Sequence, residues 1–249
     1  MLFDLKHNLY MIISALVSVG LLVLFKVFIK SKERKDLILK LTAIVTVILH
    51  FSSLYVDYFT YGFAEVDSTM LLPIYPCNIV MWLLVIVAFY KNKNSKVYKV
   101  LSESTFYIGL AGGVIGIALN EAYMNTPSLA DWDILKGLLS HSTMLLGCIY
   151  LVVGNYIQIR VSNVISIFFG LMLMMIDGIG MIWLFKSFGL EPPNAMFLLG
   201  VPFEAPKWFN TITIGVLAVV LVFIISAIYE MIALKKEDRW YSRLRRIKG

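Results

Sequence analysis

Two side chains in the sequence have the chemistry of a nucleophile and of a base. Cys77 lies in the segment LPIYPCNIVMWL, directly after Pro76, and His141 lies in LLSHSTMLL. A thiol in apolar surroundings is inert, but an imidazole within hydrogen-bonding reach can take its proton and produce a thiolate that attacks an ester carbonyl. Covalent acyl transfer, with Cys77 as the nucleophile and His141 as the base, is therefore one chemistry that these residues permit.

Other polar residues of the apolar segments could assist such a reaction. Asp177 or Asp57 could orient the imidazole, as the acid of a catalytic triad does. The amides of Asn120, Asn78 or Asn194 could donate hydrogen bonds to an oxyanion. The sequence leaves open which of them does so.

Several of these residues also have a purely structural explanation. Cysteine is among the most buried residue types and often only fills space. His50, Ser53 and Asp57 fall at i, i+3 and i+7 on one helix face, which could equally form a hydrogen-bonded seam between helices. Asp177 lies in DGIG and could be a polar packing residue beside small ones.

The composition indicates which elements must position these residues. Hydrophobic residues make up 59% of the 249 and charged residues 15%, and the mean hydropathy is +0.82. In a soluble protein about a quarter of the residues are charged. We therefore expect one all-α transmembrane domain over residues 1–249. Seven apolar segments are each long enough to cross a bilayer, and a basic tail follows them at 235–249; the segments are 9–29, 38–59, 71–90, 98–120, 134–155, 162–186 and 208–234.

The charges in the connections predict an orientation. Lys and Arg dominate the connections after the first, third and fifth segments and the carboxyl-terminal tail, whereas the alternate connections carry mainly Asp and Glu. Because cytoplasmic loops are enriched in basic residues, we expect the amino terminus outside and the carboxyl terminus in the cytoplasm. An anionic inner leaflet also accounts for the net charge of +6, so no nucleic-acid partner is expected.

In this orientation the polar residues share one depth in the membrane. At 1.5 Å per residue, Cys77 and His141 lie ~9 Å and ~10 Å below the outer ends of their segments. His50 and Asp177 lie ~13 Å deep by the same measure, and Asn120 closes the fourth segment on the same side. Ionisable residues within a membrane usually face a bundle interior or a water-filled cavity. We therefore expect one polar site in the outer half of the membrane.

The fourth segment presents a face of small residues. Gly109, Gly113, Gly116 and Asn120 fall at i, i+4, i+7 and i+11. Such spacing usually lets two helices approach closely, although the same smooth face could admit an acyl chain.

Neither a metal site nor a disulfide is expected. The three histidines and two cysteines have no zinc-site spacing. Cys148 lies ~10 Å deeper than Cys77, and disulfide-linked Cα atoms lie within about 7 Å of each other. We also expect no cofactor.

Four segments resemble a known family. LPIYPCNIVMWL, GLAGGVIGIALN, LLSHSTMLLGCIYLVV and NAMFLLGVPF, in this order, are similar to the YwaF-like bacterial integral membrane proteins, a family related to transmembrane protein 164 of animals. The resemblance covers roughly residues 10 to 230. It implies acyl transfer between phospholipids in a bacterial plasma membrane, with Cys77 as the acyl carrier and His141 as its partner. Tyr75 and Asn78 stand where bacterial members often have His and Ser, and Asn194 begins the match to their N-Y-M-F-L pattern.

The sequence thus predicts a multi-pass lipid acyltransferase or transacylase whose partners are membrane lipids, a phospholipid or a lysolipid. With water as the acceptor the same site would be a hydrolase. The alternative is a non-enzymatic lipid-binding protein or a transporter. A transport path would need polar residues in both halves of the membrane, and the inner half carries little beyond terminal charges.

Overall fold

The protein is all-helical over the residues that the structure, a computed structural model, describes: 3–63, 68–120, 123, 127–200, 208 and 210–243. The end of the expected tail (244–249) and the last residues of the NAMFLLGVPF motif (201–203) lie outside them. The longer helices are α1 (Leu5–Phe28), α2 (Lys32–Tyr61), α3 (Pro76–Phe89), α4 (Lys96–Ala118), α6 (Trp132–Val153), α7 (Ser166–Ser187) and α8 (Thr211–Ala233). Short 3-10 turns form η2 (Ser68–Leu71), η3 (Val161–Asn163), η4 (Ala195–Phe197) and η5 (Lys236–Asp238).

Six helices are long and apolar enough to cross a membrane, and the third expected segment is the exception. Within the segment 71–90 the α-helix covers only Pro76–Phe89, and these 14 residues are shorter than the six helices that are long enough to cross a membrane. At 1.5 Å per residue α3 is ~21 Å long, short of the ~30 Å hydrocarbon core. Pro76 sets this boundary, because a proline fits the first turn of a helix but cannot continue one from before. The expectation of seven full-length spans is therefore not met by the described residues.

Side-chain caps explain where most of the helices begin. Five of the long helices start directly after a residue whose side-chain oxygen accepts a hydrogen bond from a backbone N–H of the first turn; these residues are Asp4, Ser31, Ser95, Asp131 and Asn210. Such caps satisfy donors that have no partner within the helix. The cap at Ser31 also starts α2 before the apolar segment, so its first turn carries charged residues.

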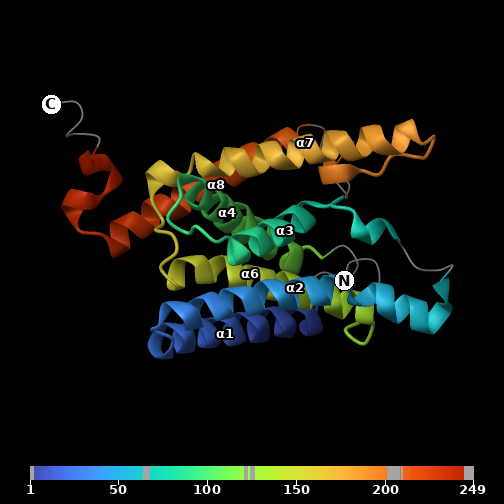
Figure 1. The fold of residues 1–249 in the computed structure, drawn as a ribbon, viewed down its shortest axis with the longest axis horizontal. Helices are drawn as coiled ribbons and strands as arrows, with labels where there is room; N and C mark the ends of the chain where they lie inside the picture. Colours follow the sequence, from blue (N-terminus) through green and yellow to red (C-terminus); the bar gives the residue numbers. More distant parts are fainter. Residues whose placement is uncertain are drawn as a thin grey trace.

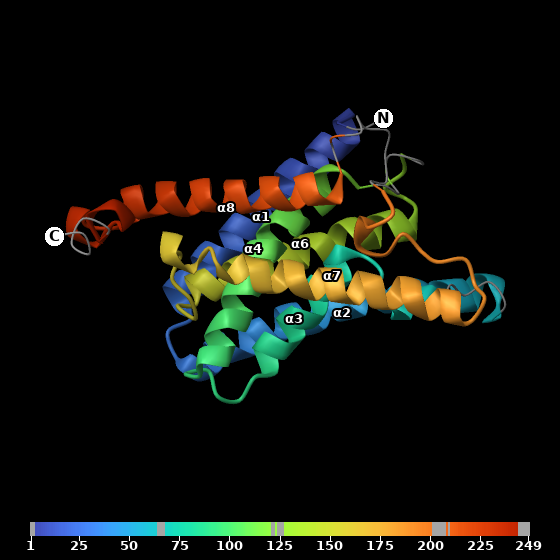
Figure 2. The same ribbon diagram turned by 90° about the horizontal axis from the view of Figure 1, so that it is seen from above.

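The helices form a bundle in which α6 and α4 are central. In Figure 1, α1 and α2 lie along the lower edge, α6, α3 and α4 in the middle, and α7 along the upper edge, while α8 runs obliquely toward the carboxyl terminus at the left. The helix α6 contacts α1, α2, α3 and α4, while α4 also contacts α3, α7 and α8. Figure 2 shows α8 reaching beyond the bundle toward the carboxyl terminus. The outer helices α1 and α8 expose most of their apolar side chains, as helices facing lipid do.

The glycine face of the fourth segment packs directly against α6. A Cβ atom at Gly109 would lie 2.3 Å from Cys148 Sγ, and one at Gly113 would lie 3.0 Å from Leu145 Cβ. No acyl chain fits where two helices are this close. Of the two explanations for the small residues, close helix packing is the correct one at these positions.

Candidate functional site

The residues that flank His141 tie α6 to two neighbouring helices. Ser142 Oγ lies 2.9 Å from both Tyr10 Oη and Ser14 Oγ of α1. Thr46 Oγ1 of α2 donates to Thr143 Oγ1 at 3.1 Å. Polar contacts of this kind hold membrane helices in register. The serine and threonine neighbours of His141 thus fix the position of the helix that carries it.

His141 itself lies in the contact between α6 and α4. Its Nδ1 is 2.7 Å from the carbonyl oxygen of Gly137. A carbonyl oxygen only accepts, so Nδ1 carries the proton and Nε2 is the basic nitrogen. The ring lies over Gly116, where a Cβ atom would be 2.1 Å from Cδ2 and 2.4 Å from Nε2. A backbone carbonyl therefore orients the imidazole, the role expected of Asp57 or Asp177.

Lys136 is a buried cation that the sequence pattern does not single out. Lys136 is only 7% exposed. The ammonium donates to Ser53 Oγ of α2 at 2.8 Å and lies 3.6 Å from the carboxylate of Asp133. Its presence inside the apolar segment 134–155, five residues before His141, is the signal that could have identified it.

Lys136 lies on the same helix as His141, and its ammonium donates to Ser53 on the helix that also carries His50. Helix α3, which carries Cys77, contacts both α2 and α6. The helices that carry Cys77, His50 and His141 therefore pack against one another, and Lys136 is a buried cation in the contact between two of them.

Cys77 lies in the first turn of α3 and is partly exposed. Its Sγ donates to Asn78 Oδ1 at 3.3 Å, while Asn78 Nδ2 donates to the carbonyl of Leu72 at 3.0 Å. The amino end of a helix favours a negative charge at this position, whereas apolar surroundings disfavour it. Both cysteines of the chain are free, as their different depths predict.

The turn η4, which follows α7 in the sequence, packs on the residues that precede Cys77. The backbone N–H of Met196 donates to the carbonyl of Ile74 at 2.8 Å. The rings of Tyr75 and Phe197 are 6.1 Å apart. Two of the four segments that carry the family resemblance, far apart in the sequence, thus meet at the start of α3.

Asn194 organises this loop. Its Nδ2 donates to the carbonyl of Gly200 at 2.7 Å, and its Oδ1 accepts from the backbone N–H of Leu199 at 2.9 Å. Met196 and Phe197 have φ angles of 53° and 56°, a left-handed conformation that is uncommon outside glycine. The amide of Asn194 therefore has a structural role in holding a strained turn against Ile74.

The remaining expected residues lie in different environments. Asn120 caps the end of α4: its Oδ1 accepts from the backbone N–H of Tyr123 at 2.9 Å, and its Nδ2 lies close to Gly137. Gly137 is also the residue whose carbonyl contacts His141. Asp177 lies on α7 with a buried Oδ2 that has no hydrogen-bond partner among the described residues. The Nε2 of His50 is likewise buried and unpartnered within those ranges.

The third histidine has a structural role. His7 is fully buried, its Nε2 donates to the carbonyl of Ile117 at 2.9 Å, and its ring stacks on Tyr123 at 4.7 Å. Its Nδ1 accepts from the backbone N–H of Phe3. The backbone N–H of His7 and the phenol of Tyr123 both donate to the Asp4 carboxylate. These hydrogen bonds, that of His7 first, lower the pKa of Asp4 from its ordinary value of 3.8. This group of contacts fastens the start of α1 to the end of α4.

The comparison with protein families gives one match. The TMEM164 family matches residues 2–229 of the chain. The chain belongs to the TMEM164 family. No curated protein and no solved structure matches it. In this TMEM164 family protein the two most specific motifs, the cysteine after the proline and the Ser-His pair, lie on the contacting helices α3 and α6. No three His, Cys, Asp or Glu side chains come together as a metal site within the described ranges.

Proposed function

We propose that this TMEM164 family protein is a lipid acyltransferase in which Cys77 carries the acyl group and His141 is the base. The observation that carries the proposal is the packing of α3, which carries Cys77, against α6, which carries His141 and the buried ammonium of Lys136. A buried cation favours both the thiolate and the negatively charged oxygen that forms when an ester is attacked. The basic nitrogen of His141 is defined by the contact of the other nitrogen with Gly137.

The reaction has two halves. In the first, His141 Nε2 takes the Cys77 proton, and the thiolate attacks the ester carbonyl of a phospholipid. The C–O bond breaks, the lysolipid oxygen takes the proton from the imidazolium, and the acyl group stays on Cys77 as a thioester. In the second, His141 takes the proton of an acceptor hydroxyl, whose oxygen attacks the thioester. The thiolate then leaves and regains its proton from His141.

Lys136 has the properties of the group that stabilises the developing oxyanion. Its ammonium is held by Ser53 and is close to Asp133, so its position does not depend on substrate. A donor fixed before the reaction stabilises a transition state more than one that must be reorganised. Of the asparagines considered for this role, Asn194 is bonded within its own loop.

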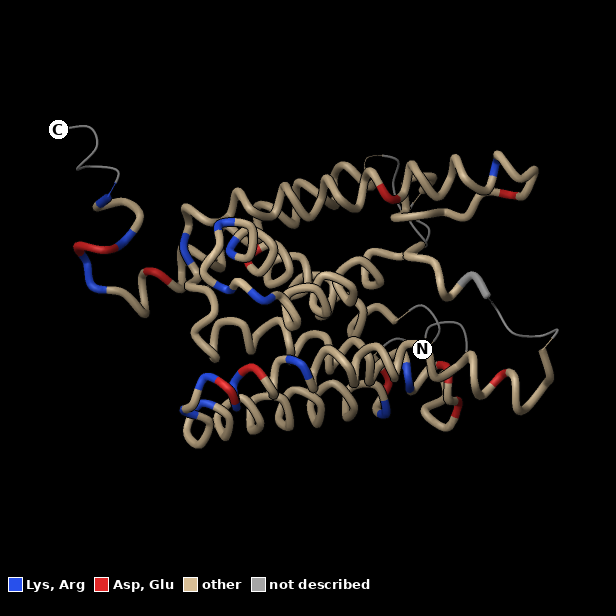
Figure 3. Tube along the Cα trace, in the orientation of Figure 1, with Lys and Arg blue, Asp and Glu red and all other residues tan. Residues whose placement is uncertain are grey.

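The site is proposed to face the outer leaflet of a bacterial plasma membrane. Lys and Arg gather at the end of the bundle that carries the carboxyl terminus (Figure 3). The positive-inside rule assigns that end to the cytoplasm. Cys77 lies in the first turn of α3, and α3 ends toward the basic connection with α4. The thiol is therefore at the other end, close to the depth of lipid ester groups.

Acyl loading of the protein tests the proposal. The purified full-length chain is incubated with a phospholipid that carries a labelled acyl chain and then treated with neutral hydroxylamine, which cleaves thioesters. We expect labelled protein that hydroxylamine releases, and no label on Cys77→Ala. Cys148→Ala is the matched control, because it removes the other, fully buried thiol, and it should load normally. Unchanged lipid turnover by Cys77→Ala would exclude covalent catalysis.

One observation favours the alternative of lipid binding without turnover. The Cys77 thiol donates to Asn78 instead of an imidazole. If this arrangement persists when lipid is bound, the protein should retain lipid through purification and carry no hydroxylamine-sensitive acyl group.

A further inference from the structure

A cavity lies at the end of the bundle where α4 begins, away from Cys77. Its volume is about 510 Å³. Its walls come from the start of α4, from the connection between α6 and α7, and from the carboxyl-terminal segment that follows α8. Polar side chains line it, and three of them are the cations Lys99, Arg160 and Arg243.

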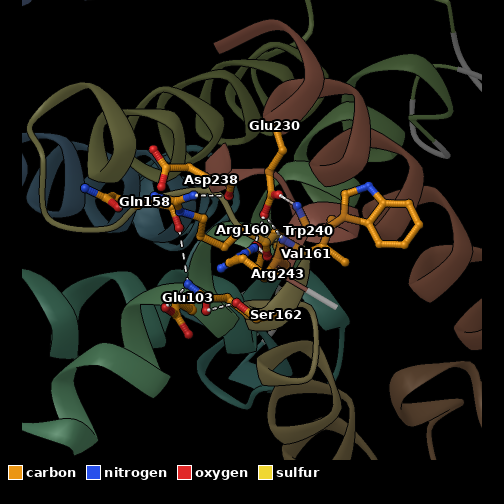
Figure 4. A network of polar contacts seen from close by, with 11 residues as sticks. Glu103, Gln158, Arg160, Val161, Ser162, Glu230, Asp238, Trp240 and Arg243 are labelled. Atoms are coloured by element: carbon orange, nitrogen blue, oxygen red, sulfur yellow. Dashed lines mark hydrogen bonds and ion pairs between the residues drawn. The ribbon is translucent and has the colours of Figure 1, made fainter. Parts of the chain in front are cut away.

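A buried carboxylate fixes one wall of this cavity. Glu230 of α8 is 0% exposed. It accepts hydrogen bonds from the backbone N–H groups of Val161 at 2.9 Å and Trp240 at 2.5 Å, and from the guanidinium of Arg243 at 2.8 Å (Figure 4). These contacts fold the carboxyl-terminal segment back onto the connection between α6 and α7. The positive charge of Arg243 is therefore balanced by Glu230.

A second carboxylate supports the opposite wall. Glu103 of α4 is 3% exposed and accepts from Asn163 Nδ2 at 2.6 Å and from Ser166 Oγ at 2.7 Å. The ammonium of Lys99 lies 3.8 Å from it. Glu103 therefore accepts hydrogen bonds from two donors, and its charge is partly balanced by the ion pair with Lys99.

Arg160 differs from the other two cations. Its guanidinium donates to the backbone carbonyl of Asp238 at 3.2 Å and to the side-chain oxygen of Gln158 at 3.5 Å. Both acceptors are neutral, and no carboxylate of the described residues lies within ion-pair distance of Arg160. A guanidinium has five N–H donors in a planar fork that matches the oxygens of a phosphate. Asp238 also lines the cavity, and the charge of its carboxylate would limit how much negative charge the cavity accepts.

The position of the cavity indicates where a ligand would come from. Trp240 lies beside it and packs on Phe223 of α8 at 6.2 Å, an arrangement typical of the membrane interface. Basic pockets between membrane helices on the cytoplasmic side bind the headgroups of anionic lipids. The volume is equivalent to roughly 17 water molecules at ~30 Å³ each, which is ample for a glycerophosphate group.

We infer that this cavity binds a phosphate ester, the headgroup of an anionic lipid of the inner leaflet, with Arg160 as its principal ligand. The phosphate oxygens accept from the free N–H groups of the guanidinium. Lys99, whose side chain is 64% exposed, adds a second positive charge at the rim. A lipid held here fixes the carboxyl-terminal segment against the bundle.

Titration of the purified full-length chain with short-chain lipids tests the inference. Dioctanoyl phosphatidylglycerol, dioctanoyl phosphatidylcholine and glycerol 1-phosphate are compared by native mass spectrometry. We expect phosphatidylglycerol to bind and phosphatidylcholine to bind much more weakly. Arg160→Gln should weaken phosphatidylglycerol binding about 10-fold to 100-fold, the usual effect of losing a charge-assisted hydrogen bond. Arg160→Lys, which keeps the charge without the fork, should fall between Arg160→Gln and the unchanged chain.

Lys236→Gln is the matched control. It removes one positive charge from the same segment at an exposed position outside the cavity, and it should change the affinity less than about twofold. Equal weakening by Lys236→Gln and Arg160→Gln would overturn the site in favour of general surface charge. Unchanged binding by an Arg160→Gln protein with an unaltered unfolding temperature would overturn it too. Glycerol 1-phosphate that binds as tightly as the lipid would keep the site but exclude the leaflet as the source.

Discussion

At the scale of single residues, the position of His141 depends on the missing side chain at Gly116. A methyl group there would lie 2.1 Å from the imidazole, so Gly116→Ala must move the ring or separate the helices. We expect acyl loading of Cys77 to fall by roughly 10²–10⁴, the effect of losing a positioned general base. The measurement is the rate of thioester formation with labelled phospholipid.

Gly112→Ala provides the comparison for this change. It lies one turn earlier on the same helix, and nothing is within 4 Å of its Cβ position. It should load at the normal rate and raise the stability of the helix by about 0.5–1 kcal/mol. Equal loading by the Gly116→Ala and Gly112→Ala proteins would show that the position of His141 is irrelevant to the chemistry.

The ammonium of Lys136 permits a second prediction. Lys136→Gln keeps a hydrogen-bond donor but removes the buried positive charge from the helix that carries His141. If this charge stabilises the oxyanion, the loading rate should fall by about 10²–10³ while lipid binding changes little. Lys186→Gln, at an exposed position at the end of α7, should leave the rate unchanged. A fall in binding with no change in rate would instead make Lys136 a lipid ligand.

Residue type was enough to predict Cys77 and His141 as candidate site residues, but it did not predict that Lys136 is buried. A lysine near the end of an apolar segment usually extends to the interface, so its charge is not expected to be buried. Its burial depends on Ser53, which comes from another helix. Contacts between helices are decided by packing, which the order of residues along one helix does not reveal.

At the scale of elements, the boundaries of the segments were partly predictable. Pro76 marked the start of α3, and the polar caps mark most of the other starts. The apolar run 71–90 alone did not predict how short α3 is, because it includes Leu71, Leu72 and Ile74 before Pro76. Pro76 ends the helix on that side, and the contact of Ile74 with Met196 holds the preceding residues against η4.

The contact between α4 and α6 can be tested by a double-mutant cycle. Gly109→Ala places a Cβ atom 2.3 Å from Cys148 Sγ in the buried core. Such overpacking typically costs 1–3 kcal/mol, so we expect about this loss in the free energy of unfolding. Cys148→Ala in the same chain removes the sulfur atom. It should restore part of the lost free energy of unfolding, with a coupling energy of about 0.5–3 kcal/mol between the two changes. Thermal or denaturant unfolding in detergent measures both. Additive effects would mean that the two helices are not in contact at this point.

At the scale of the whole molecule, composition and hydropathy predicted a membrane environment and most of the membrane-spanning helices. It could not show which helices touch, because lipid and a neighbouring helix are equally apolar surroundings. The structure supplies that information: α6 and α4 form the centre, and α1 and α8 are peripheral (Figures 1 and 2). The proposed acyl site and the cavity at Arg160 lie toward opposite ends of this bundle, so each depends on the same orientation in the membrane.

That orientation is the last prediction. In a Cys77→Ala/Cys148→Ala background, which has no native thiol, Ser68→Cys and Ser242→Cys each introduce a thiol near one end of the bundle. Because Lys and Arg gather at the end of the bundle that carries the carboxyl terminus (Figure 3), we expect a membrane-impermeant maleimide to label Ser68→Cys in intact cells. It should label Ser242→Cys only after the cells are permeabilised. The opposite pattern would put Cys77 in the inner half of the membrane. The cavity at Arg160 would then face the outer leaflet, and its ligand would have to come from there.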